Sequence, residues 1–359
     1  MPKIVFYVSS HGFGHATRAI ELISNLPELI GVEVVTTAPR WLFYRSLKRA
    51  FTYHDYLHDC GVMQIDSLQQ DIKGTFERWN DLLDHYPEMA EEEAQRLEKI
   101  GADLVIGDIS PFAVAVAEAA ELPSLIVANF SWNWIFTAFL TYEPRFQEII
   151  DRIADYYART TLLLKTPLSG DLSVFPDAKD IPLIARRSKK TRSQARKALG
   201  LPLDGRVVLI TFGGCGLNRI KKEQLAARSD INFLTFNREL AGPPNIWILD
   251  PERIYHPDAV RASNLVLAKL GYGIVSECIA HETPIAYIPL SNFPEQGVFE
   301  SELPKYLSSY KIQDDIFHDG QWDFLDVAFE AAASQTQPHE RLALNGGEVA
   351  TDILCDLLR

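Results

Sequence analysis

Short apolar runs alternate with helix-periodic segments in the first third of the chain. Apolar residues typical of buried strands fill the runs 3–8, 102–107 and 124–128, and β-branched residues dominate the run 32–37. Between them, apolar residues recur with helical spacing over 16–26 and 112–121. Strands that alternate with helices in this way predict a parallel sheet covered by helices on both faces.

The same alternation begins again near residue 206. Strand-like runs occupy 206–212, 231–236, 245–249, 264–268 and 284–289. The last two runs flank a glycine turn and a helical segment at 274–280, which together predict a βαβ unit. Helical patterns complete the chain, the last over 348–358. The pattern therefore predicts a second α/β unit after the first.

Residues 166–191 lie between the two units and are rich in Pro, Asp and Ser. We therefore expect a first domain over 1–165, a linker over 166–191 and a second domain over 192–359. We also expect the final helix to pack back on the first domain. The natural ligand site of such an arrangement is the cleft between the domains.

The segment between the units ends in a basic run at 185–197, with seven Lys and Arg residues and no acidic residue. One interpretation is a solvated linker and helix start. Two functional interpretations are a phosphate contact from Arg186 or Arg187 and peripheral attraction to an anionic membrane surface.

Composition narrows the class of protein. The chain has 359 residues and is 47% hydrophobic, enough for a substantial core. Its net charge of −13 argues against general nucleic-acid binding. The four cysteines form no CxxC pair, which argues against a zinc ribbon or disulfide scaffold and favours a reducing, cytoplasmic location. No apolar run reaches the ~20 residues of a membrane helix.

The segment SSHGFGHATR follows the first predicted strand. Gly12 and Gly14 allow a tight turn there and close approach to a ligand. The third glycine of a dinucleotide fingerprint is missing, and the strand 32–37 ends without a carboxylate for a ribose. This turn is therefore a poor match to an NAD site.

Two histidines of this turn, His11 and His15, are candidates for proton transfer. A neutral imidazole accepts a proton from a hydroxyl near neutral pH. Asp108 ends another strand of the same predicted sheet, so it lies at the same edge and is able to orient such a ring. We expect His15 to face the open cleft from the start of the first helix, and His11 to be packed.

A second glycine turn contains Gly271 and Gly273 and precedes a helix, whose free backbone N–H groups favour phosphate. Glu277, in the first turn of that helix, either complements the helix dipole or binds a vicinal diol such as ribose. Glu295 and Gln296 follow the next strand and are expected to bind sugar hydroxyls.

Two further groups of residues have competing interpretations. The first is a strand-like stretch with residue types that bind metals: His54, Asp55, His58, Asp59 and Cys60. Because spacing alone is a weak signal, we expect no metal site there. An aromatic cluster either lines an apolar acceptor wall or belongs to the core: Trp132, Trp134, Phe136 and Phe139.

Several motifs together resemble a known family. They are HGFGHATR at 11–18, ADLVIGD at 102–108, NFSW at 129–132, FGG at 212–214, LGYGIVSE at 270–277 and NGGEVA at 345–350. The chain resembles GT-B glycosyltransferases and, nearly end to end, the N-terminal glycosyltransferase-like domain of plant L-arabinokinases. The sugar-kinase domain of arabinokinases has no counterpart in this sequence, so the resemblance does not imply arabinose phosphorylation.

The resemblance implies a GT-B fold, in which two Rossmann-like α/β domains face each other across a cleft. A UDP-type nucleotide-sugar donor would lie on the second domain and a hydroxyl acceptor on the first. His15 matches the family's catalytic base and Asp108 its partner. Backbone amides and basic groups would stabilise the leaving group, with no obligatory metal or other cofactor.

The resemblance also implies which residues lie on the donor side and which lie on the acceptor side. The donor side comprises Gly14, Arg187, Gly213, Gly214, Gly271, Gly273, Ser276, Glu277, Glu295 and Gln296. The acceptor side comprises His11, Asn129 and Trp132. The leading hypothesis is a hexosyl- or pentosyltransferase and not a kinase. The alternatives are a nucleotide-sugar hydrolase or epimerase, and a non-catalytic nucleotide-sugar sensor.

Overall fold

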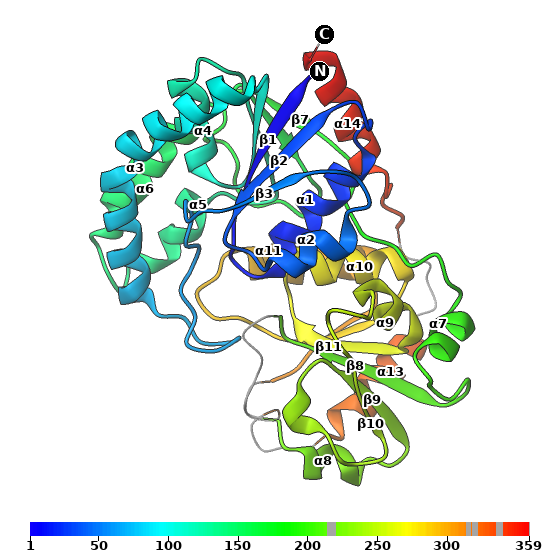
Figure 1. Cartoon of the computed structure of the whole chain (residues 1–359). Helices are drawn as coiled ribbons and strands as arrows, with labels where there is room; N and C mark the ends of the chain where they lie inside the picture. Colours follow the sequence, from blue (N-terminus) through cyan, green and yellow to red (C-terminus); the bar gives the residue numbers. More distant parts are fainter. Residues whose placement is uncertain (214–219, 314–316, 318–321, 335–339, 359) are drawn as a thin grey trace.

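Two parallel sheets, each covered by helices, form the molecule (Figure 1). The computed structural model describes residues 1–213, 220–313, 317, 322–334 and 340–358. The first sheet has the order β3-β2-β1-β4-β5-β6-β7 and the second β10-β9-β8-β11-β12-β13. No described strand joins one sheet to the other, which confirms the prediction of two Rossmann-like α/β domains.

The first domain is a seven-stranded sheet with helices on both faces. Its strands are β1 (Lys3–Val8), β2 (Gly31–Thr36), β3 (Thr52–Asp55), β4 (Leu104–Asp108), β5 (Ser124–Ala128), β6 (Leu162–Lys165) and β7 (Ala178–Asp180). One face carries α1 (Phe13–Asn25) and α2 (Arg40–Ser46). The other carries α3 (Ile72–Ile100), α4 (Pro111–Ala119), α5 (Trp132–Phe136), the 3₁₀ helix η1 (Thr137–Phe139) and α6 (Phe146–Tyr157).

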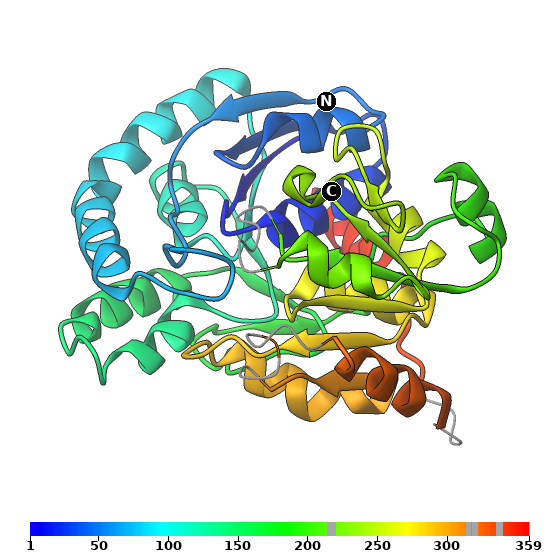
Figure 2. The same ribbon diagram turned by 90° about the horizontal axis from the view of Figure 1, so that it is seen from below.

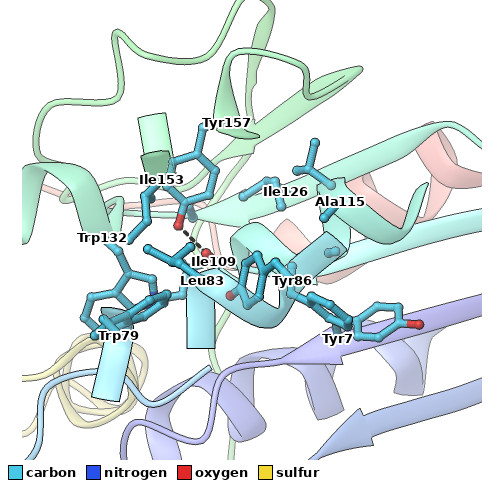
Figure 3. Close-up of a cluster of buried hydrophobic side chains, with 14 of the residues drawn as sticks. Tyr7, Trp79, Leu83, Tyr86, Ile109, Ala115, Ile126, Trp132, Ile153 and Tyr157 are labelled. Carbon is cyan, nitrogen blue, oxygen red and sulfur yellow. Dashed lines mark hydrogen bonds between the residues drawn. The ribbon is translucent and has the colours of Figure 1, made fainter. Parts of the chain in front are cut away.

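The central strands β1 and β4 are mostly apolar and almost fully buried because helices cover both of their faces. A cluster of large side chains fills the space between the sheet and α3, α4, α5 and α6, with Trp79, Tyr86 and Trp132 fully buried (Figure 3). The hydroxyl of Tyr157 satisfies its hydrogen-bonding capacity by donating to the carbonyl of Ile109, directly after β4. This packing fixes the end of β4, where Asp108 lies.

The second domain repeats the arrangement with a six-stranded sheet. Its strands are β8 (Arg206–Thr211), β9 (Ile231–Thr235), β10 (Ile246–Ile248), β11 (Leu265–Lys269), β12 (Ile285–Ile288) and β13 (Ser309–Lys311). One face packs against α7 (Arg192–Ala198), α9 (His256–Ala262), α10 (Tyr272–His281) and α11 (Glu295–Tyr306). The other packs against α8 (Lys222–Ala227) and α13 (Phe324–Ser334), and η2 (Arg238–Leu240) precedes β10.

The last helix, α14 (Gly346–Leu357), lies on the first domain beside α1 (Figures 1 and 2). Ala350, Ile353 and Leu354 belong to the same apolar cluster as α1 and α2. A Cβ atom at Gly346 would lie 2.1 Å from the carbonyl oxygen of Pro182, so only glycine permits this close approach. The two ends of the described chain therefore meet in one domain.

The segment expected to be only a linker also contributes to the first sheet. Its residues Ala178–Asp180 form β7, which pairs with β6 in parallel, with Lys165 opposite Asp180. All three residues of β7 are exposed at the sheet edge, so they carry no apolar signal in the sequence.

Candidate functional site

The carboxyl ends of the two sheets meet at the N-termini of α1 and α10. A Cβ atom at Gly273 would lie 3.1 Å from the Cα atom of Gly14, so the glycines let the two helix ends touch. Helix N-termini carry partial positive charge, which favours an anion at this position. The crevice beside them is lined by Gly14, Thr17, Arg18, Ile184, Arg186, Tyr272, Gly273, Ser276 and Glu277.

The structure brings His15 and Asp108 together at the carboxyl edge of the first sheet. Nδ1 of His15 lies 2.7 Å from Oδ1 of Asp108, and both side chains are buried. An ionised carboxylate only accepts hydrogen bonds, so Nδ1 carries the hydrogen and Nε2 is left as an acceptor. No described residue hydrogen-bonds Nε2. In the neutral tautomer set by this contact, Nε2 is the ring atom that is able to take up a proton.

Arg18 also belongs to this site, although no role was expected for it from the sequence. Its Nε and Nη2 atoms donate to the two carboxylate oxygens of Asp108 at 2.8 and 2.7 Å. Burial alone would raise the pKa of Asp108, but the charge and hydrogen bonds of Arg18 lower it below its usual range. A spacing of three residues places Arg18 on the same face of α1 as His15, which is a signal that the sequence contained.

His11 occupies a different environment. Its Nδ1 accepts a hydrogen bond from the backbone N–H of Val62 at 3.2 Å, and its ring stacks on Phe293 at 5.9 Å between centroids. Burial, with the charges of Lys269 and His15, lowers the pKa of His11 well below its usual value. We expected His11 to be packed and His15 to face an open cleft, yet His15 is the more buried of the two.

Glu277, which was expected on the donor side, is 2% exposed and uses both carboxylate oxygens within the protein. Arg186 donates from Nε and Nη2 to Oε1 at 2.9 and 2.5 Å. Nδ1 of His256 lies 2.6 Å from Oε2. Burial opposes ionisation, but the charges of Arg186 and His256 lower the pKa of Glu277 to about 2. A ribose diol would therefore have to share these oxygens with two protein partners.

Glu295 and Gln296 are also engaged within the protein. Gln296 donates from Nε2 to the carbonyl of Leu270 at 2.8 Å and accepts from the N–H of Leu290 at 3.3 Å. Oε1 of Glu295 accepts from Nδ2 of Asn129, in the other domain, at 2.6 Å. Burial raises the pKa of Glu295 to about 7, although this bond and the charges of Arg18 and Lys269 oppose the rise.

The other residues that were expected on the donor side have different environments. Gly271 precedes α10 in extended conformation, and Ser276 donates to the carbonyl of Gly273 at 2.9 Å. Gly213 has a φ of 76°, in the left-handed region. Arg187 is exposed, in contrast to its buried neighbour Arg186. The expectation for Gly214 lies outside the described residues.

Trp132, expected on the acceptor side, is fully buried. Its Nε1 donates to Oδ2 of Asp59 at 2.8 Å, and its ring contacts His11 edge-on at 5.4 Å between centroids. The ring of Phe136 also stacks on the ring of Trp132. These aromatic rings therefore pack in the core next to the histidines and do not form an exposed surface for an acceptor. Of the four aromatic residues considered for a wall, only Trp134 is partly exposed.

Neither a metal-binding cluster nor a helix able to span a membrane is found in the described part of the chain. No group of three or more His, Cys, Asp or Glu side chains there is arranged to hold a metal ion. Within the stretch 54–60, His58 instead bonds Ser110 and the carbonyl of Val35. None of the described helices has the length and apolar character needed to cross a membrane.

Comparison with known proteins identifies relatives by sequence and, separately, by structure. No family model matches the chain. The chain is 32% identical over 358 residues to L-arabinokinase of Arabidopsis thaliana, covering 97% of this chain and 34% of that protein. It is 24% identical over 264 residues to an uncharacterized glycosyltransferase of Methanopyrus kandleri, covering 66% of this chain and 72% of that protein.

Solved structures share the architecture at low sequence identity. A ugt transferase from Siraitia grosvenorii in complex with UDP matches over 100% of both chains, with a TM-score of 0.58 and 12% identity. The chain spans about a third of the length of the plant relative, so the similarity concerns that part alone. The chain thus has the GT-B glycosyltransferase fold and is related, along almost its entire length, to the N-terminal part of L-arabinokinase.

Proposed function

We propose that this protein transfers a sugar from a UDP-type nucleotide sugar to a hydroxyl acceptor at the junction of its two domains. The observation that carries the proposal is the 2.7 Å contact between His15 and Asp108, which leaves Nε2 of the ring as a proton acceptor. The glycosyltransferase relatives support the reaction class. The UDP bound by a protein of the same fold supports the donor class.

In the proposed reaction, the acceptor hydroxyl gives its proton to Nε2 of His15 while its oxygen attacks the anomeric carbon of the donor. The bond from that carbon to the phosphate oxygen breaks, and the nucleoside diphosphate leaves with the electron pair. Asp108 stabilises the imidazolium that forms. The N-termini of α1 and α10, which meet at Gly14 and Gly273, stabilise the charge on the diphosphate.

The test is turnover of a panel of nucleotide sugars with hydroxyl acceptors, in wild type and His15→Ala. General-base catalysis contributes about 10²–10⁴-fold, so we expect a loss of that order in His15→Ala, with donor binding retained. His11→Gln is the matched control and should lose much less, because His11 bonds backbone rather than Asp108. Full turnover in His15→Ala would contradict the assignment and make His11 the next candidate.

A second candidate is a nucleotide-sugar binding module without turnover. The observation that favours it is the engagement of Glu277 and Gln296 in hydrogen bonds within the protein. The panel without acceptor separates the possibilities: free sugar indicates a hydrolase, a new nucleotide sugar an epimerase, and binding alone a sensor or a transferase that lacks its acceptor.

We also propose that the reaction needs neither an obligatory metal nor ATP. Transfer should survive a chelator, because the helix N-termini and basic groups are proposed to stabilise the leaving group. Incubation with ATP and L-arabinose should give no phosphorylated sugar. Loss of transfer with chelator, restored by a divalent cation, would overturn the first part of this proposal.

A further inference from the structure

Arg18 lies at the point where the two domains meet. Within the first domain its guanidinium holds both oxygens of Asp108. It also approaches the second domain, because its Cζ atom lies 4.8 Å from the ring centroid of Tyr272, at the start of α10. The hydroxyl of Tyr272 accepts from the N–H of Ile184, which fixes the ring. Arg18 thus contacts the partner of the proposed base and the opposite domain at once.

A second connection runs through Asn129, which follows β5. Its Oδ1 accepts from Nη1 of Arg18 at 2.8 Å, and its Nδ2 donates to Oε1 of Glu295 at 2.6 Å. The amide is therefore oriented with its oxygen toward a cation and its nitrogen toward a carboxylate. This orientation joins Arg18 to the first residue of α11 in the second domain.

All members of this connection are buried, with Asn129 fully so and Arg18 and Glu295 at most 4% exposed. Buried polar groups without partners are costly, so each member depends on the next for its hydrogen bonds. Moving α11 away would leave Nδ2 of Asn129 without its partner and would free the amide to turn. Nη1 of Arg18 would then lose its acceptor.

We propose that Arg18 is a positioning residue, and that the connection from Glu295 through Asn129 makes the placement of Asp108 and the His15 ring depend on contact between the domains. This inference rests on the proposed function for its catalytic consequence. The base would be correctly oriented only when α11 and α10 lie against the first domain. Glu295 would act as an interdomain contact and not as a ligand for the donor sugar.

The guanidinium suits this role for a geometric reason. Arg18 presents its donors in a rigid planar fork, so two of its nitrogens bind one carboxylate while a third faces another acceptor. Fixing Nη1 on Asn129 therefore also fixes the plane in which Nε and Nη2 meet Asp108. A lysine ammonium would keep the charge but lose this directional link.

The experiment compares Asn129→Leu, Glu295→Leu, the double variant and the conservative Glu295→Gln. Tyr142→Phe is the matched control, because Tyr142 donates to Asn292 across the same domain boundary at 3.0 Å without touching this connection. Turnover is measured against donor concentration. Amide hydrogen exchange of α1 residues 17–20 is measured without any substrate.

We expect each leucine variant to lower kcat about tenfold while the donor KM stays within about threefold, since a hydrogen bond to a charged group is lost away from the donor. The double variant should be no worse than the poorer single variant. Glu295→Gln keeps an acceptor oxygen and should recover most of the kcat. Exchange in α1 should rise about tenfold in both leucine variants and stay unchanged in Tyr142→Phe.

Each result that would contradict the proposal has a different meaning. An increase in donor KM at constant kcat would show that Glu295 binds the sugar, and additive losses would show that Asn129 and Glu295 act separately. Unchanged exchange in α1 would overturn the coupling itself. If the wild type turns over no donor of the panel, the proposed function fails, while the exchange data still decide whether the two domains are linked through Arg18.

Discussion

Two buried carboxylates of the second domain, Glu277 and Glu295, have pKa values shifted in opposite directions. Glu277 in α10 accepts from Arg186 and pairs with His256, and its pKa falls to about 2. Among the described residues, Glu295 at the start of α11 bonds one neutral partner, Asn129, and its pKa rises to about 7. The two side chains are almost equally buried, at 2% and 4% exposure.

The difference shows that the partners, and not the depth, set the charge of a buried acid. Burial penalises the ionised form of both residues. A bidentate guanidinium and an imidazole offset this penalty at Glu277, whereas one amide and more distant cations do not offset it at Glu295. The first carboxylate therefore stabilises the domain, while the second remains responsive to its surroundings at the domain boundary.

The largest expected effect is that of Glu277→Ala. Removing this carboxylate leaves the 8% exposed Arg186 without its partner, and breaking a buried ion pair in this way costs about 3–5 kcal/mol of unfolding free energy. Urea unfolding measures this loss, and calorimetric titration of the folded variant measures any change in donor affinity. If the variant is as stable as wild type, Arg186 has another partner, and the contrast between Glu277 and Glu295 does not hold.

The second-largest effect is expected in the loss of unfolding free energy at acidic pH. Glu277 has a folded-state pKa of about 2 against an ordinary 4.5, so folding favours its ionised form. Its contribution, about 3 kcal/mol, is complete above pH 4.5 and is lost as the pH falls toward 2. Unfolding titrations of wild type and Glu277→Gln between these pH values check this, and parallel curves would contradict it.

Glu295→Gln should act in the opposite sense. Because the folded-state pKa of Glu295 is about 7 and its ordinary value is 4.5, the wild-type fold loses stability as the pH rises from 4.5 to 7. Replacing the acid with a neutral amide should therefore stabilise the protein by about 1–3 kcal/mol at pH 8 and leave it unchanged near pH 4.5. Urea midpoints at both pH values are the measurement. Destabilisation at pH 8 would show that the ionised carboxylate is needed.

The smallest effect is expected for Arg187→Ala, which sharpens the contrast with buried Arg186. Arg187 is exposed, and substitution of an exposed side chain changes stability by less than about 0.5 kcal/mol. Thermal unfolding tests this directly. Binding of UDP to the same variant tests the expected phosphate contact, since unchanged affinity would remove Arg187 from the donor side.

Much of the fold was predictable because strand and helix periods leave a local signal. The apolar runs at β1, β5 and β8 predicted those strands within a residue of their bounds. The start of α1 was missed by three residues, since Gly12 and Gly14 favoured a turn there although Phe13 continues the apolar stripe of the helix. The exposed edge strand β7 was missed for a similar reason.

The sequence by itself determined two α/β units and placed His15 and Asp108 at the same sheet edge. These features depend on the period of apolar residues and on the rule that parallel strands end together. Only the tertiary structure decided the partner of each buried charge. Arg186 lies 91 residues from Glu277, and Asn129 lies 166 residues from Glu295. No local pattern encodes pairs so far apart, and the protonation of buried acids depends on those pairs.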